Sequence, residues 1–228
     1  RQKRYLQQFG IPDSKIRIAQ MTVDVDRITA MAAEIRNHRN SIRGELCVGD
    51  AETLFVYVGR LEPWKGIKLL LEAFESLELA DARLMVVGDG SCRPLVEKAA
   101  AEDTRIRFIG RRNFEGVVEA FAISDIAVIP SSFESWGLVV NEALAAGTAV
   151  IASDRVGSVD DLVIHGTTGI IFPFDDGDTL AALMFQLGCD AALRGRLAKE
   201  GQRLISVWNL ASASDIMFDC WRGRSASL

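Results

Sequence analysis

Two acidic residues lie eight positions apart in the segment ESWGLVVNE (134–142). We expect Glu134 in a loop and Glu142 about one turn into a helix over residues 138–146, so that both carboxylates face one crevice. A carboxylate there can accept hydrogen bonds from two hydroxyls of a ribose or hexose, each contributing roughly 1.5–3 kcal/mol. The N–H groups of Gly137 and Leu138 remain free for a phosphate at the helix start. The small, apolar residues 143–146 argue against Glu142 as a solvated surface charge.

Two cations, Arg60 and Lys65, lie in the segment GRLEPWKG (59–66), between an apolar run and a helical pattern. Backbone donors, the helix dipole and two positive side chains together favour a diphosphate ligand. The alternative is that both cations are solvated and pair with Glu62. Their position at the expected end of a strand, flanked by two glycines, favours the ligand.

A second glycine turn, GDGS (88–91), follows another apolar run and leads into a helical pattern that Pro94 helps to start. Gly88 and Gly90 permit a close backbone approach to a ligand, or serve only as a turn between a strand and a helix. The chain contains neither the G-x-G-x-x-G fingerprint nor a phosphate loop ending in Gly-Lys-Ser/Thr. These absences disfavour a nicotinamide dehydrogenase and a nucleoside triphosphatase.

The elements that must position these residues follow from six short, nearly continuous apolar runs, which are typical of strands buried on both faces. They are residues 54–58, 84–87, 106–109, 126–129, 149–152 and 170–172. Helical patterns over residues 67–77, 94–101, 114–122 and 138–146 alternate with them. The order predicts a Rossmann-like, doubly wound parallel α/β sheet. Because ligands bind at the carboxyl ends of such strands, the loops described above are the expected site.

Both flanks of this region carry helical patterns. Residues 1–50 are expected to be a lead-in, with a strand at 15–19 and a helix over 27–39. The tail is expected to start at an N-cap, Asp178, and to continue as helices to about Trp221, with interruptions near Gly188 and Gly201. We therefore divide the chain into residues 1–50, a binding domain over 51–205 and a C-terminal helix within 206–228.

The composition argues against several other classes of protein. The 228 residues are 49% hydrophobic and 25% charged, with a net charge of -5, which disfavours a disordered chain and a nucleic-acid binder. No apolar run approaches the roughly 20 residues of a membrane span. The four cysteines form no C-x-x-C pair and the two histidines are far apart, so we expect no metal site and no disulfide framework. Isolated thiols suit a cytoplasmic location.

Taken together, these motifs resemble the C-terminal, donor-binding domain of retaining glycosyltransferases of the GT-B fold, family 4, also called glycosyl transferases group 1. The resemblance covers roughly residues 10–222. Its most specific part is the Glu-x7-Glu motif from Glu134 to Glu142, followed by ALAAG (143–147). The diphosphate motif GRL with the later Lys-Gly, VGDG (87–90) and the fourth strand with its flanks follow the same order.

The resemblance implies a role for each candidate residue. Arg60 and Lys65 would hold the diphosphate and stabilise the charge that develops on the leaving group, while Glu134 would bind the donor sugar. The nucleotide would be bound by Gly88, Gly90, Gly110, Arg111, Gly137, Leu138 and Glu142, with Glu142 on the ribose and the loop at Gly110 along the base. Members of the family need no metal and no other cofactor, because the cations take the place of the metal.

Two departures from the family pattern stand out. Gly157-Ser158 and Asp161 occur where the family shows Gly-Gly and Glu, and Gln20-Met21-Thr22 replaces its common Pro-Asn-Gly turn. The resemblance implies that residues 1–50 are a linker and a remnant of the family's N-terminal acceptor-binding domain. The rest of that domain is missing, so this chain is expected to be incomplete for catalysis. Its expected partners are a UDP- or GDP-sugar, that missing domain, and a polysaccharide, glycolipid or lipid-linked acceptor, with no nucleic acid.

Two alternative functions and one possible surface contact remain open. A nucleotide-sugar epimerase shares the two-domain fold, and a non-catalytic nucleotide-sugar-binding module would keep the same pocket. Basic residues at Arg1, Lys3 and Arg4 are compatible with peripheral contact at the inner face of the membrane, although a solvated helix face explains them as well.

Overall fold

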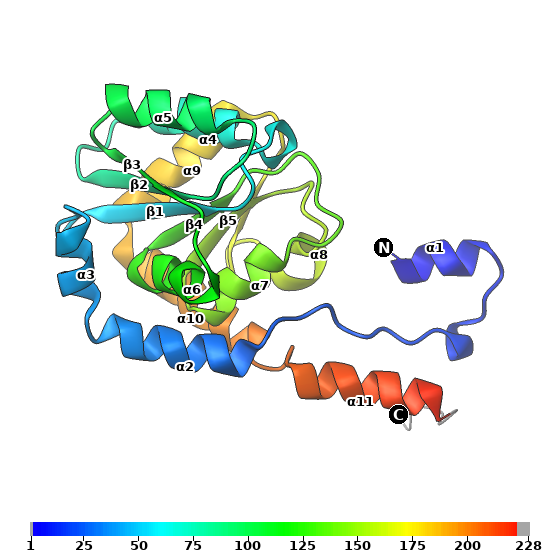
Figure 1. Cartoon of the computed structure of the whole chain (residues 1–228). Coiled ribbons are helices and arrows are strands. Elements are labelled where there is room, and N and C mark those ends of the chain that lie inside the picture. The colour runs from blue at the N-terminus through cyan, green and yellow to red at the C-terminus, as the bar shows by residue number, and fades with distance from the viewer. Residues whose placement is uncertain (1, 223–228) are drawn as a thin grey trace.

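The computed structural model describes residues 2–222, in which six parallel strands form one sheet in the order β3-β2-β1-β4-β5-β6 (Figure 1). The strands are β1 (Thr53–Val58), β2 (Ala82–Val87), β3 (Ile106–Gly110), β4 (Ile126–Ile129), β5 (Ala149–Ser153) and β6 (Ile170–Phe172). β1 pairs with β2 without a break from Thr53↔Ala82 to Val58↔Val87. Each strand overlaps a predicted apolar run. The predicted α/β class and parallel sheet are therefore confirmed.

Helices cover both faces of the sheet, as the doubly wound prediction requires (Figure 1). α4 (Ile67–Glu75), α5 (Arg93–Glu102) and α9 (Gly177–Cys189) lie on one face, and α2 (Val25–Arg36), α6 (Phe114–Ile123) and α7 (Leu138–Ala145) on the other. α3 (Arg39–Glu45) contacts α6, α8 (Val159–Leu162) follows β5, and α10 (Ala191–Ile205) contacts both α7 and α9. Successive residues of β1 enter opposite cores: Phe55 packs with Phe74, and Val56 with Phe121.

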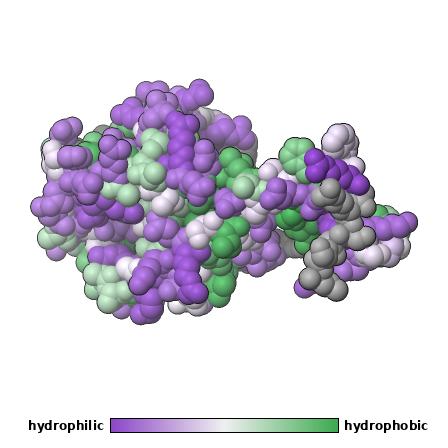
Figure 2. All heavy atoms as spheres, turned by 90° about the horizontal axis from the view of Figure 1, so that it is seen from below, coloured by the Kyte–Doolittle hydropathy of each residue, from purple (hydrophilic) through white to green (hydrophobic). Residues whose placement is uncertain are grey.

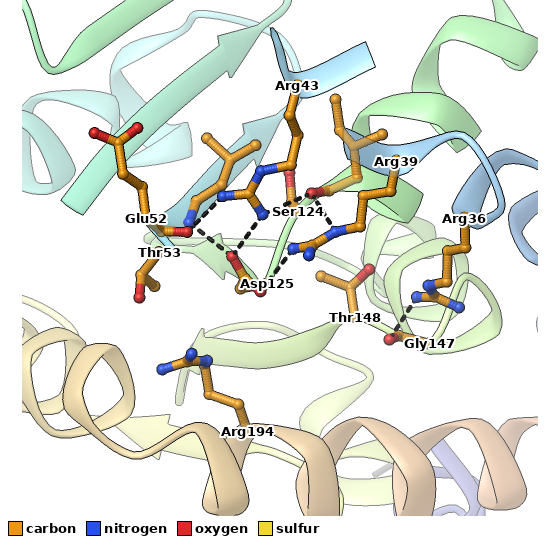
Figure 3. Close-up of polar contacts among 12 residues, drawn as sticks. Arg36, Arg39, Arg43, Glu52, Thr53, Ser124, Asp125, Gly147, Thr148 and Arg194 are labelled. Carbon is orange, nitrogen blue, oxygen red and sulfur yellow. Dashed lines mark hydrogen bonds and ion pairs between the residues drawn. The ribbon is translucent and has the colours of Figure 1, made fainter. Parts of the chain in front are cut away.

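Three arginines from residues 36–43 fasten α2 and α3 to the sheet domain (Figure 3). Arg39 Nη2 and Arg43 Nη1 lie 2.8 and 3.3 Å from the two carboxylate oxygens of Asp125, which also accepts the N–H of Leu54 at 2.8 Å. Arg43 is 0% exposed, and burial, followed by the charge of Arg39, lowers the pKa of its guanidinium. Asp125 precedes β4, so this cluster lies at the end of the sheet opposite the strand ends where ligands bind.

The C-terminal end of α7 receives three donors from two other helices, α2 and α10. Thr29 Oγ1 and Gln202 Nε2 each donate to the carbonyl of Ala145 at 3.1 Å, and Arg36 donates to the carbonyl of Gly147 at 2.8 Å (Figure 3). The last carbonyls of a helix have no partner within the helix itself. These donors therefore satisfy carbonyls that would otherwise be unpaired in a buried place.

The two ends of the chain extend away from the sheet domain (Figure 1). The N-terminal end comprises α1 (Gln2–Gln8) and the 3-10 helix η1 (Asp13–Lys15), and the C-terminal end comprises α11 (Leu210–Trp221). The space-filling view shows hydrophobic residues gathered at the narrow junction and hydrophilic residues over most of the sheet domain (Figure 2). Lys3 forms an ion pair with Asp13 at 2.7 Å. Arg1 and residues 223–228 lie outside the described residues.

Several expectations for the two flanks are wrong. Residues 15–19 form no strand, because no sheet edge lies beside them to supply hydrogen bonds, and β3 and β6 are the edge strands. The helix predicted over 27–39 is present as α2 but ends at Arg36, and a second helix, α3, which was not predicted, begins at Arg39. Asp178 lies inside α9, whose N-cap is Asp176, since the Asp176 carboxylate accepts both the N–H and the hydroxyl of Thr179.

The interruption expected near Gly201 is also absent, while the break near Gly188 occurs at Asp190. α10 runs through Gly201, where a Cβ atom would lie 2.6 Å from Cδ2 of Leu144 on α7. This glycine therefore permits close packing of two helices and does not end one.

Asp125→Ala should lower the free energy of unfolding by about 3–5 kcal/mol, because it leaves the buried Arg43 and the neighbouring Arg39 without their counter-charge. Urea unfolding followed by circular dichroism measures this change. Glu72→Ala is the control, since its ion pair with Lys68 at 3.6 Å is exposed and should contribute little. Equal losses in the two variants would contradict the role given to Asp125.

Candidate functional site

The loops at the carboxyl ends of the strands meet backbone to backbone, and glycines make this possible. A Cβ atom on Gly66 would lie 1.9 Å from the carbonyl oxygen of Pro130, so the loop after β1 touches the loop after β4. A Cβ atom on Gly88 would lie 1.8 Å from the carbonyl oxygen of Gly59. Gly66 also has a left-handed φ of 71°, which favours glycine. The packing of these loops fixes the distance between the side chains they carry.

Lys65 and Glu134 face each other across this junction. Lys65 Nζ forms an ion pair with Glu134 Oε1, and the same oxygen accepts the hydroxyl of Ser131 at 3.1 Å. Their side chains are 19% and 14% exposed. Both residues line a cavity of about 280 Å³ at the ends of β1 and β4, together with Gly137 and Leu138. Four predicted site residues are thus brought together.

The start of α7 opens onto the same cavity. Gly137 is the N-cap residue of α7 and has a φ of 90°. Because no side chain caps this helix, its first N–H groups have no partner from a capping side chain. The loop after β5 supports this turn from behind: Gly157 N–H donates to the Glu134 carbonyl at 3.0 Å, and Ser158 N–H donates to the Trp136 carbonyl at 2.8 Å. The segment 157–158, where the sequence departs from the family pattern, therefore packs directly on the loop that carries Glu134.

Arg60 does not line the cavity with Lys65. Its side chain is exposed and its guanidinium lies over the ring of Trp64, 5.3 Å from the centroid. The backbone at Arg60 is fixed, because its carbonyl accepts the Tyr57 hydroxyl at 2.7 Å. Glu62, considered as a partner for the two cations, accepts the hydroxyl of Ser91 at 2.7 Å.

Gly88, Gly90, Gly110 and Arg111 do not line this cavity. Gly90 approaches the loop after β1, where a Cβ atom would lie 2.5 Å from the carbonyl oxygen of Leu61. The carbonyl of Gly110 accepts the N–H of Gly88 at 3.0 Å, and Arg111 is exposed. The close backbone contacts of Gly88 and Gly90 are therefore made with the loop after β1, and their approach to a ligand stays a prediction.

Glu142 lies on α7, is largely buried and does not line the cavity with Glu134. Burial raises the pKa of this carboxyl from its ordinary value to about 7. A buried carboxylate is costly unless hydrogen bonds compensate it. Glu142 is consequently poised between its neutral and charged forms near neutral pH.

The sequence reasoning missed Ser131 and Met21. Ser131 lies two residues after the end of β4, and this position was a usable signal for a partner of Glu134. Met21 lines the cavity from the segment that leads into α2. No local pattern marks it, because its place depends on how the chain returns across the sheet domain.

Comparison with known proteins identifies the family of this chain. Residues 39–204 match the family described as glycosyl transferases group 1, and the chain belongs to this family. Its relatives are named as enzymes that transfer sugars, which favours sugar transfer over the epimerase and the non-catalytic module.

Individual relatives match over part of their length. A D-inositol 3-phosphate glycosyltransferase of Corynebacterium efficiens is 33% identical over 197 residues, which are 76% of this chain and 46% of the relative. A phosphatidyl-myo-inositol mannosyltransferase of Mycolicibacterium smegmatis is 34% identical over 164 residues, 69% of this chain and 42% of the relative. The chain thus spans less than half the length of these relatives.

The fold is shared with HepE of Anabaena, solved in complex with UDP and glucose. The TM-score is 0.80 at 19% identity, over 97% of this chain and 60% of that chain. Within residues 2–222, no helix is both long and apolar enough to cross a membrane. The same residues contain no cluster of three His, Cys, Asp or Glu side chains placed to hold a metal ion.

Gly66→Ala should destabilise the chain by at least about 2 kcal/mol more than Gly10→Ala. Both glycines have nearly the same positive φ, 71° and 76°, but a Cβ atom at Gly10 meets nothing within 4 Å. The difference between the two variants therefore isolates the contact with the Pro130 carbonyl from backbone strain. Thermal and urea unfolding measure it, and equal stabilities would mean that the two loops can separate at little cost.

Proposed function

We propose that this chain is the donor-binding part of a retaining glycosyltransferase that takes a sugar from a UDP- or GDP-sugar. The observation that carries the proposal is the cavity in which Lys65, Glu134 and the start of α7 converge. An ammonium group and a helix N-terminus on one small cavity suit a ligand with a diphosphate. A carboxylate beside them suits the sugar hydroxyls of the same ligand.

In this proposal Lys65 exchanges its partner when the donor binds. Its ion pair with Glu134 keeps the ammonium group at the cavity wall. The two phosphate groups of a diphosphate would compete with Glu134 for this ammonium group, because they are stronger acceptors. Glu134, relieved of the cation, would accept hydroxyls of the donor sugar while Ser131 still orients one of its oxygens. Arg60 would join from the exposed side of the loop. The positive charge would then stabilise the leaving nucleotide without a metal.

Transfer itself would need the part of the relatives' length that this chain does not span. We propose that this part binds the acceptor, a polysaccharide, a glycolipid or a lipid-linked sugar, and closes the reaction cleft. We also propose a cytoplasmic location. Lys3 does not favour contact with a membrane, because its ammonium group is already paired with Asp13.

Lys65→Met should weaken binding of UDP or GDP by about tenfold or more, since a charge-assisted hydrogen bond to phosphate is lost. Isothermal titration calorimetry measures the affinity, first with EDTA and then with magnesium, and binding in EDTA is expected. Lys68→Met is the matched control, because Lys68 lies three residues later on the exposed face of α4. Failure of the wild-type chain to bind any nucleotide diphosphate would contradict the proposed function.

Nucleotide affinity should rise about tenfold between pH 6 and pH 8 if the Glu142 carboxylate accepts the ribose hydroxyls. With a pKa of about 7, about a tenth of the carboxyls are ionised at pH 6 and about nine-tenths at pH 8. Affinity rises with pH because burial raises the pKa of Glu142 to about 7. The ionised carboxylate, which accepts the hydroxyls, is therefore lost as the pH falls through 7. Glu142→Gln should remove this component and keep only the titration of the nucleotide's own phosphate. An identical pH profile in both proteins would sink the ribose assignment.

A further inference from the structure

A closed circuit of contacts links the loop that carries Glu134 to two distant segments. The indole N–H of Trp136 donates to Oδ1 of Asn141 at 2.9 Å, and Asn141 Nδ2 donates to the carbonyl of Met21 at 3.1 Å. The hydroxyl of the next residue, Thr22, donates to the carbonyl of Trp208. The ring of Trp208 stacks on that of Trp136, with centroids 5.8 Å apart and planes inclined by 23°. We call these five residues the Trp136 circuit.

Asn141 is the buried centre of this circuit. It lies on α7, is 0% exposed, and uses one amide atom on each of two partners from outside its helix. Removing one partner of a buried polar group costs more than the hydrogen bond itself, because the other group remains unsatisfied. The position of the Trp136 indole and the path of the chain at Met21 therefore depend on the same amide.

The circuit joins places that matter for the site. Met21 and Trp136 line the cavity with Lys65 and also a neighbouring cavity of about 490 Å³. Residues 21–22 and 206–209 are the two connections that run from the sheet domain toward α1 and α11 (Figure 1). The two ends of the chain also meet just beyond the circuit. The hydroxyl of Ser212, on α11, donates to Oε1 of Gln20 at 3.3 Å.

We propose that Asn141 is a positioning residue for the donor loop. Through Trp136 it sets the place of Glu134 and of the free N–H groups at Gly137 and Leu138, and it ties them to both connecting segments. The consequence for nucleotide binding rests on the proposed function, whereas the positioning itself does not.

The first test needs no ligand. Stacked indole rings couple their electronic transitions and give paired bands of opposite sign in circular dichroism. Trp208→Phe removes the pair and defines the zero level. We expect Asn141→Leu to reduce the paired bands by half or more, and Thr22→Val, a near-isosteric change at the far side of the circuit, to reduce them as well.

Gln202→Leu is the matched control, because it also removes an amide hydrogen bond to α7, but at the opposite end of the helix. It should keep the paired bands. The proposal is overturned if Asn141→Leu and Thr22→Val keep them too, or if Gln202→Leu loses them equally. Thr22→Val decides the matter should Asn141→Leu not fold.

The second test concerns the consequence for the site. Calorimetry with UDP and GDP should show at least a fivefold loss of affinity in Asn141→Leu and no comparable loss in Gln202→Leu. The double variant Trp136→Phe with Asn141→Leu should lose less than the product of the two single losses, since it removes the donor and its acceptor together. A loss in the double variant that equals the product of the two single losses would contradict the link between Trp136 and Asn141. Absence of nucleotide binding in the wild type would refute the proposed function, while the paired bands still decide the positioning role.

Discussion

The candidate site depends on a steric constraint, the contact of bare backbone between neighbouring loops. Parallel strands end at one edge of the sheet, but their loops can close on one another only where no Cβ atom intervenes. Gly66 against the Pro130 carbonyl and Gly88 against Gly59 meet this condition. Because the first of these contacts joins the loops after β1 and β4, it also decides that Lys65 and Glu134 meet. The opposite charges come together because the backbones do.

The electrostatics of the site follow from different degrees of burial. Lys65 and Glu134 keep about a sixth of their side-chain surface and neutralise each other, which makes their partial burial affordable. Burial raises the pKa of the Glu142 carboxyl to about 7. Arg60 remains in solvent and stacks on Trp64. The cavity is thus lined by an internal ion pair, whereas the Glu142 carboxyl and the exposed Arg60 guanidinium lie outside its lining.

The sequence predicts the sheet well because its signals are local. Runs such as residues 126–129 are apolar at every position, which only a strand buried on both faces requires, and the loop residues after them follow from chain direction alone. The flanks depend on distant partners: the stretch 15–19 has strand-like residues but no free edge to pair with, and Gly201 reads as a break because its neighbour Leu144 is far away in the chain. Likewise, Lys65 pairs with Glu134 and not with the nearer Glu62, because loop packing outweighs proximity along the sequence.

The C-terminal end of α7 is anchored by side chains of two other helices. Donors from Thr29, Arg36 and Gln202 hold the last carbonyls of this helix, whose eight residues span about 12 Å. Because Thr29, Arg36 and Gln202 hold this end together, the loss of one donor on α2 or α10 leaves two in place, and the amides at Gly137 keep their position. The start of α7 depends instead on the contacts of its own end, so the two ends of this helix can change independently in sequence.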